Sequence, residues 1–246
     1  MPFTLSHTVA VLPVSKRNWA SATGLFIGSM VPDFEYFFRL RVFGIYGHTF
    51  WGMFWFDLPV AILLAYAFHY LVKPVLLPNL PPVLQRKWSG WNDFNWHGFV
   101  KQNWIIVIVS VLFGTATHLL WDAFTHNNTI IVRAIPALSA QVDLGFEEYP
   151  VWHLLQQISS AAGLIILIFY VIRLPETGDA RQPGKSFWTA LVILVLSIMT
   201  WKLVEISNQE ILKIGHFAVI GMGAAMYGLL LISGIYQLFI KSKYDI

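Results

Sequence analysis

Three side chains that can bind a metal recur at intervals of four residues in the stretch TATHLLWDAFTHNN, residues 115–128: His118, Asp122 and His126. On an α-helix this spacing places all three on one face, spread over roughly 12 Å at about 1.5 Å per residue. Imidazole nitrogens and carboxylate oxygens are ordinary ligands of zinc and similar cations. The alternative is a set of interfacial, hydrogen-bonded side chains in which Asp122 caps the chain near Thr125. The pattern favours a metal site.

Further ligand-type residues lie within the first fifty residues. Asp33 directly follows a proline and Glu35 lies two residues further on, and the backbone restriction before that proline predicts a helix end there. Two carboxylates at a helix break can supply one metal ligand and one general base, although a plain helix cap would use the same residues. One helix face cannot enclose an ion, so His48, in the sequence Gly-His-Thr, and His7 are the imidazoles that would complete the coordination.

The composition indicates which elements must position these groups. Of the 246 residues, 57% are hydrophobic and only 12% are charged, whereas a soluble domain carries about a quarter charged residues. The net charge of +3 comes from scattered Lys and Arg, so nothing indicates nucleic-acid binding. The chain has no cysteine, which excludes disulfides, thiolate ligands and a cysteine nucleophile. The sequence therefore predicts an integral membrane protein, with the lipid bilayer as its surroundings.

Five apolar segments are long enough to cross a bilayer: residues 51–72, 104–124, 151–173, 186–203 and 214–240. Residues 19–38 form a sixth apolar segment, which the proline and the two acids interrupt. We therefore predict an all-α helical bundle in the membrane, with about five full spans and an N-terminal partial or full membrane helix. The expected domain is a single one covering residues 1–246: residues 1–50 supply the N-terminal half of the site, 51–173 the first three spans and 186–240 the last two.

The blocks MPFTLSH, IGSMVPDFEYF, GHTFWG and THLLWDAFTH together resemble a bacterial family of multi-spanning membrane proteins of unknown function. Their order is similar to that of the inner-membrane metal-dependent hydrolase-like family, a group distantly similar to zinc-dependent phospholipase C and the P1-type nucleases. The resemblance implies a place in the bacterial inner (cytoplasmic) membrane and a shared set of metal ligands: His7, Asp33, His48, His118 and Asp122.

The chain departs from the pattern of these relatives at several points. Glu35 stands where relatives often carry Asp, and His126 falls where they vary. The chain lacks the N-terminal Trp of a processed phospholipase and has fewer His than a full trinuclear zinc site. The resemblance therefore implies one or two divalent ions, with zinc the expected metal.

The expected function is that of a membrane-bound, metal-dependent hydrolase acting on a phosphoester or lipid-like substrate. Glu35 or Asp33 would be the base, and the other carboxylate a ligand. Two non-enzymatic alternatives remain, a transporter-like protein that binds an ion or proton and a structural metal site. A closed pocket at one membrane face would favour hydrolysis, whereas a polar path through the bundle would favour transport.

Overall fold

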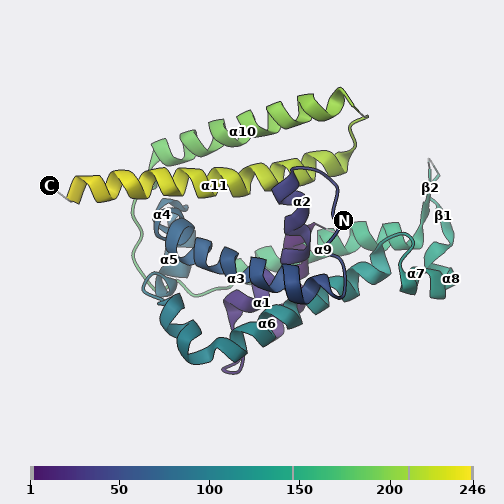
Figure 1. Cartoon of the computed structure of the whole chain (residues 1–246), viewed down its shortest axis with the longest axis horizontal. Helices are drawn as coiled ribbons and strands as arrows, with labels where there is room; N and C mark the ends of the chain where they lie inside the picture. Colours follow the sequence, from purple (N-terminus) through teal and green to yellow (C-terminus); the bar gives the residue numbers. More distant parts are fainter. Residues whose placement is uncertain (1–2, 146, 210, 245–246) are drawn as a thin grey trace. The chain divides into compact units, whose positions relative to one another are not determined.

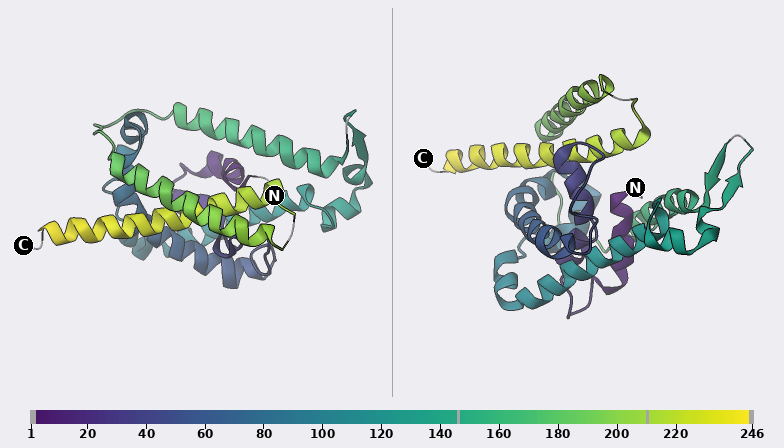
Figure 2. Two further views of the ribbon diagram at one scale, coloured as in Figure 1. Left: turned by 90° about the horizontal axis from the view of Figure 1, so that it is seen from above. Right: turned by 45° about the vertical axis from the view of Figure 1, so that its right-hand side comes forward.

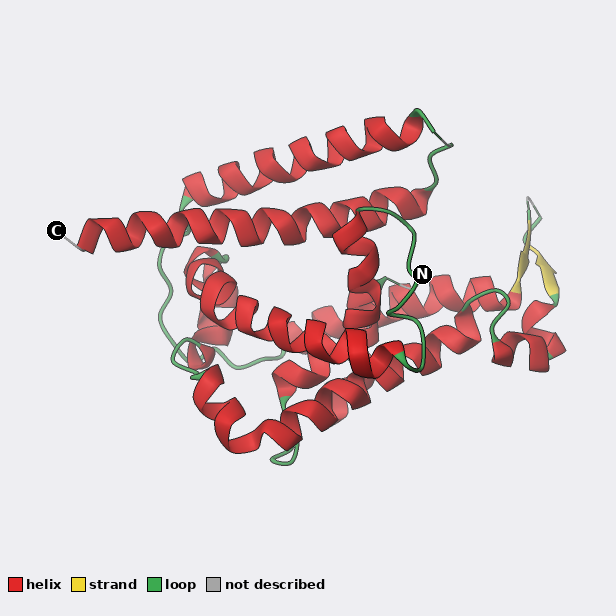
Figure 3. Ribbon diagram, in the orientation of Figure 1, coloured by secondary structure: helices red, strands yellow, loops and turns green. Residues whose placement is uncertain are grey.

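The computed structural model describes residues 3–145, 147–209 and 211–244, and helices dominate it (Figures 1 and 3). Four short helices precede the first long one: η1 (Thr4–Val14), α1 (Ala22–Gly28), η2 (Val31–Asp33) and α2 (Phe34–Arg39). The apolar segment predicted at residues 19–38 is therefore broken twice, at the bend before Val31 and at the start of α2. It contains no single helix long enough to cross a membrane.

The middle of the chain contains two long helical stretches. The first consists of η3 (Met53–Asp57), α3 (Leu58–Tyr66), η4 (Ala67–Val72) and α4 (Lys73–Asn79). Two short helices, α5 (Pro82–Trp88) and η5 (Ser89–Trp91), lead to the second stretch, α6 (Trp96–Thr125).

The remaining elements are two short helices, one hairpin and three long helices: α7 (Ile130–Ala134), α8 (Pro136–Ser139), β1 (Gln141–Asp143), β2 (Glu148–Pro150), α9 (Val151–Ile172), α10 (Lys185–Ser207) and α11 (Ile214–Tyr244). The strands pair antiparallel, with Gln141 opposite Pro150.

Among the residues that the structure describes, five helical stretches are long and apolar enough to cross a membrane: Met53–Asn79, Trp96–Thr125, Val151–Ile172, Lys185–Ser207 and Ile214–Phe239. The predicted all-α membrane bundle with five spans is confirmed. The second span begins earlier than predicted, but its backbone is non-helical at Asn103 (φ −131°, ψ 31°), next to the predicted start. The first span continues past Lys73, whose ammonium group donates hydrogen bonds to the carbonyls of Trp91 and Phe94.

The described chain divides into two compact units. Unit 1 comprises the N-terminal segment through Asp33, residues Ile45–Ala61 and residues Asn103–Arg173. Unit 2 comprises Phe34–Gly44, Ile62–Gln102 and the segment from Leu174 onward. This division does not test whether the chain is a single membrane domain, so that expectation from the sequence stays a prediction.

In unit 1, α1 packs directly against the backbone of α6. A Cβ atom at Gly28 would lie only 2.3 Å from the Val111 carbonyl oxygen, so no side chain fits there. The Thr115 hydroxyl donates a hydrogen bond to the Gly28 carbonyl across the same contact. This close approach brings the end of α1 beside the half of α6 that carries His118 and Asp122.

The helix η1 docks on the first half of α9, also within unit 1. The Ser6 hydroxyl donates to the Ser160 carbonyl at 2.8 Å, and the Phe3 N–H donates to the Ser160 hydroxyl at 2.9 Å. A Cβ atom at Gly163 would lie 2.6 Å from the Ser6 Cβ. The polar half of α9 therefore holds the short helix that carries His7.

In unit 2, α10 and α11 lie side by side and antiparallel (Figure 2). Their core is built from Val75 of α4, Phe187 and Leu191 of α10, and Ile232 of α11. Many other large apolar side chains on these two helices are exposed, as expected of surfaces that face lipid.

Candidate metal centre

Unit 1 brings together ligand-type residues from four separate segments. His7 lies on η1, Asp33 ends η2, and His118 and Asp122 lie one turn apart on α6. His48 lies in the loop before η3, and Gly47 lets this loop approach η2, because a Cβ atom there would lie 2.5 Å from the Pro32 carbonyl oxygen. Of the predicted site residues, His7, Asp33, His48, His118 and Asp122 therefore lie together, and their role as metal ligands stays a prediction.

Three donor atoms at the centre of this cluster form an almost equilateral triangle. The distances are 3.4 Å between His48 Nε2 and His118 Nε2, and 3.4 Å from each of these nitrogens to Asp122 Oδ2. With zinc–ligand bonds of about 2.0–2.1 Å, tetrahedral geometry places neighbouring donor atoms about 3.3–3.4 Å apart. The triangle therefore has the dimensions of one face of a zinc coordination sphere.

Two further donors lie beside this triangle. Asp33 Oδ1 is 3.3 Å from His48 Nε2 and 3.7 Å from His118 Nε2. His7 Nε2 is 3.5 Å from Asp122 Oδ1, and its ring stacks on that of His118 at a centroid distance of 3.8 Å. Ligand atoms within 4.8 Å of one another define two triads, His7–His118–Asp122 and Asp33–His48–His118. Both triads contain His118.

Several of these atoms are buried without the hydrogen bonds that buried polar groups normally make. Within the described part of the chain, the cluster atoms without a hydrogen-bond partner include His7 Nε2, Asp33 Oδ1 and both carboxylate oxygens of Asp122. Leaving one such group unsatisfied costs about 1–3 kcal/mol, and more for a charged group. A divalent cation is the kind of partner that such atoms can accept, so the donor set fits a metal.

A backbone carbonyl orients His118. Its Nδ1 lies 2.8 Å from the Ser29 carbonyl oxygen, and a carbonyl only accepts hydrogen bonds, so Nδ1 carries the hydrogen. The lone pair is then on Nε2, which points into the triangle. Metal-binding histidines are usually held in this way by a partner at the other ring nitrogen.

The charges of the candidate ligands His7, Asp33 and His48 favour the binding of a cation. Burial, followed by the neighbouring His118, lowers the pKa of His7 to about 3, so this ring is neutral. Burial alone would raise the pKa of Asp33, but His118 and His48 outweigh it and lower the pKa, so the carboxylate is ionised. Burial lowers the pKa of His48, but Asp122 and Asp33 together raise it to about 10. Without a metal, a proton on His48 therefore partly balances two carboxylates.

One residue of the site has no counterpart in the sequence predictions. Thr4 is buried, and its hydroxyl donates a 2.5 Å hydrogen bond to Asp33 Oδ2, while Asp33 Oδ1 faces the imidazoles. Thr4 and His7 share a face of η1, because residues three apart align on a 3₁₀ helix. The spacing Thr-x-x-His is a signal that could have identified it, whereas the Ser29 carbonyl leaves no signal in the sequence.

His126 lies at the edge of the cluster. Its Nδ1 is 3.6 Å from Asp122 Oδ1 and 3.2 Å from the Asp122 carbonyl oxygen, and its Nε2 faces the Gln156 side-chain amide at 3.4 Å. Burial lowers the pKa of His126. The predicted helix face is therefore real, but His126 approaches Asp122 Oδ1 and belongs to neither triad of the described residues, so its role as a ligand stays a prediction.

Glu35 belongs to unit 2 and not to the unit that contains the cluster. Its carboxylate accepts two hydrogen bonds from Arg39, one turn later on α2, at 2.8 and 3.2 Å. The role of Glu35 as a base therefore stays a prediction from the sequence.

Comparison with known proteins places the chain in a family. A family model described as a domain of unknown function, DUF4184, matches residues 1–234. The chain belongs to this family. No curated protein and no solved structure matches the chain significantly. The family is one of unknown function, the several apolar spans are a feature of the structure, and the similarity to the metal-dependent hydrolase-like family stays a prediction.

Proposed function

We propose that this DUF4184 protein is a membrane-bound, metal-dependent hydrolase with a single divalent ion, expected to be zinc. The observation that carries the proposal is the convergence of buried donor atoms without hydrogen-bond partners on His118 Nε2. Because His118 Nδ1 is bonded to the Ser29 carbonyl, only Nε2 is left for a metal. The two triads therefore share one ion instead of holding two.

The residues divide into roles by position. His48, His118 and Asp122 would hold the ion, with His7 beside Asp122. A bound divalent ion would lower the pKa of a coordinated water to about 7 and polarise a phosphoryl oxygen. Asp33, fixed through Oδ2 by Thr4, directs Oδ1 to the same centre and would accept the proton of that water. Asp33 is thus the carboxylate that we favour as the base.

The cluster is largely buried, but two of its histidines are partly exposed. His7, Asp33 and His118 have side chains at most 2% exposed, whereas those of His48 and His126 are 24% and 30% exposed. Buried ligand-type side chains beside partly exposed ones are the arrangement expected of a hydrolase that a substrate can reach. A polar path through the bundle, which transport would need, is not required to explain these side chains.

The partly exposed His48 lies among exposed aromatic residues. Tyr46, Phe50, Trp51, Phe54 and Trp55, on both sides of His48 in the sequence, are all exposed. No Lys, Arg, Asp or Glu occurs between positions 42 and 56. The span Met53–Asn79 begins within this group, and aromatic side chains are typical of the membrane–water interface. This supports a lipid-like phosphoester that approaches from the bilayer.

Metal content and turnover test the proposal. In detergent-purified protein, Asp122→Ala and His118→Ala should each lose the bound ion found in the parent protein. Asp143→Ala and His153→Ala are matched controls outside the cluster and should retain it. The parent protein should hydrolyse a phosphodiester such as bis-p-nitrophenyl phosphate or a short-chain phospholipid, and Asp122→Ala should not.

The outcomes separate the alternatives. Equal metal content in Asp122→Ala and Asp143→Ala would refute the metal centre. Metal that depends on Asp122, without turnover of any phosphoester, would refute the hydrolase and favour a structural metal site.

A further inference from the structure

The part of unit 1 that precedes η2 first follows α9. The Ser6 hydroxyl of η1 donates to the Ser160 carbonyl near the middle of α9. Beyond the end of η1, the Lys16 ammonium lies 5.4 Å from the centre of the Tyr170 ring, in the last turn of α9. The chain therefore runs along α9 from its middle to its C-terminal end.

The chain then turns and follows α6 back towards the candidate metal centre. The Ser21 N–H, at the start of α1, donates to the Ser110 hydroxyl at 2.8 Å. The Gly28 carbonyl, at the end of α1, accepts from the Thr115 hydroxyl at 3.2 Å. η1 has 11 residues and α1 has 7, so neither is long enough to cross a bilayer. The two helices form a hairpin that does not cross the membrane, with residues 15–21 at its tip.

The tip and the candidate metal centre lie towards opposite ends of the same spans. From Ser110 to Asp122, in its last turn, α6 rises about 18 Å at about 1.5 Å per residue. The end of α6 connects through α7, α8 and the strands to the start of α9. The last turn of α9, beside Lys16, is therefore at the membrane face opposite to that of Asp122. Arg173 directly follows this turn, and a basic residue at a helix end typically extends to the membrane surface.

The tip is exposed, basic and aromatic. Lys16 and Arg17 are exposed, and Trp19 is 63% exposed. Trp and basic side chains are both typical of the boundary between membrane and water. No Asp or Glu occurs in the segments that surround the tip: residues 15–32, 103–121 and 151–173. These segments therefore contain no carboxylate that could neutralise the two cations.

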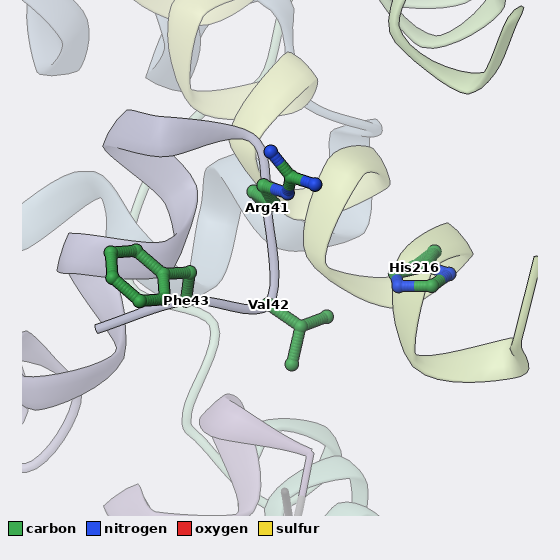
Figure 4. Close-up of a pocket in the computed structure, with 4 residues that line it drawn as sticks. All are labelled: Arg41, Val42, Phe43 and His216. Atoms are coloured by element: carbon green, nitrogen blue, oxygen red, sulfur yellow. The ribbon is translucent and has the colours of Figure 1, made fainter. Parts of the chain in front are cut away.

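Several basic side chains elsewhere are bonded within the protein. This holds for Arg39, Lys73, Arg86, Lys87 and Lys202. Arg41 lines a cavity of about 380 Å³ in unit 2, together with Val42, Phe43 and His216 (Figure 4). In contrast, the side chains of Lys16 and Arg17 have no hydrogen-bond or ion-pair partner among the residues that the structure describes. Both cations can therefore bind an anion from outside the chain.

We propose that the tip of this hairpin, Lys16, Arg17 and Trp19, binds anionic lipid headgroups of the leaflet opposite the metal centre. The ammonium and guanidinium groups supply charge and hydrogen-bond donors for phosphate oxygens. Basic residues next to a membrane surface attract anionic lipids, and the Trp19 ring is suited to the same interface. Lipid bound there holds the N-terminal hairpin at the end remote from the ligands. The proposal uses no candidate metal ligand and does not depend on hydrolysis.

A fluorophore at the tip tests the proposal. Because the chain has no cysteine, Asn18→Cys provides a single attachment point at an exposed position. The labelled protein is reconstituted into vesicles of phosphatidylcholine and phosphatidylglycerol, in which one lipid or the other carries brominated acyl chains as the quencher, at equal bromine content. We expect brominated phosphatidylglycerol to quench roughly two- to fivefold more, since one basic side chain at a membrane surface attracts an anionic lipid by about a factor of five. About 1 M salt should reduce this excess.

Variants in the same labelled background show whether the effect is local. Lys16→Gln combined with Arg17→Gln should abolish the excess quenching by phosphatidylglycerol. Arg133→Gln combined with Lys213→Gln removes the same charge from two exposed positions outside the tip and should leave the excess unchanged. A fluorophore attached instead through Gln141→Cys, exposed at the start of β1, should show no excess. Because all these positions are exposed, the variants should keep the melting temperature of the parent.

The results either support or overturn the lipid site. Greater quenching by phosphatidylglycerol that depends on Lys16 and Arg17 would support it. Equal quenching by the two lipids, an excess that survives the loss of both tip cations, or an equal loss in the variant of Arg133 and Lys213 would overturn it. Absence of quenching by either lipid would overturn the placement of the tip at the bilayer.

Discussion

Replacing Thr4 with Val tests whether the N-terminal helix orients Asp33, the carboxylate placed beside the proposed ion. Valine has nearly the shape of threonine but cannot donate the hydrogen bond that Asp33 Oδ2 accepts. A hydrogen bond to a charged group contributes about 1.5–3 kcal/mol, equivalent to roughly a 10- to 100-fold change in Kd at about 1.4 kcal/mol per factor of ten. Losing a residue that orients a ligand typically weakens metal binding by about the same factor.

We therefore expect Thr4→Val to bind zinc roughly 10- to 100-fold more weakly, measured by competition with a chelator of known affinity. Thr4→Ser keeps the hydroxyl and should stay close to the parent. Thr8→Val is the matched control: Thr8 is also buried on η1, but its hydroxyl bonds only the nearby Leu5 carbonyl. If Thr4→Val and Thr8→Val bind zinc equally well, Thr4 does not orient Asp33 for the metal.

Three other predictions concern packing and protons. Gly28→Ala should destabilise the protein by about 1–3 kcal/mol through overpacking, lowering its melting temperature, whereas Gly215→Ala, where a Cβ meets nothing within 4 Å, should not. Gly163→Val should push η1 away and weaken zinc binding through His7, while Ala162→Val on the exposed side of α9 should leave binding unchanged. Because the pKa of His48 is raised to about 10 without a metal, zinc binding at neutral pH should release a proton. Zinc affinity should therefore rise between about pH 6 and about pH 9, and a titration heat independent of buffer ionisation would contradict this.

The sequence predicts the spans well because apolar length is a local property. It predicts their ends less well. The first span continues past Lys73 because the ammonium group donates hydrogen bonds to the carbonyls of Trp91 and Phe94, far along the chain, and no local pattern reveals these partners. The four-residue spacing of His118 and Asp122 predicts their shared face, since helix geometry alone determines it. Spacing does not assign a role to Glu35. A Glu four residues before an Arg on a helix indicates an ion pair as readily as a general base.

The contacts of the centre that the sequence does not predict are those made by the backbone. The hydrogen bond that orients His118 ends on the Ser29 carbonyl, a group that every residue possesses. Whether a carbonyl reaches that ring depends on how closely α1 approaches α6 at Gly28. Such contacts depend on tertiary packing, so residue types alone do not predict them.

The distribution of the ligands along the chain has a consequence for biosynthesis. Asp33 and His48 precede the first span, whereas His118 and Asp122 lie near the end of the second. Two crossings return the chain to the side of the bilayer from which it started, so the halves of the centre meet only after both spans have inserted as a hairpin. A chain in which one of the two fails to cross would leave the halves on opposite sides of the membrane. Ion retention would therefore report correct membrane topology of the first half of the protein during its assembly.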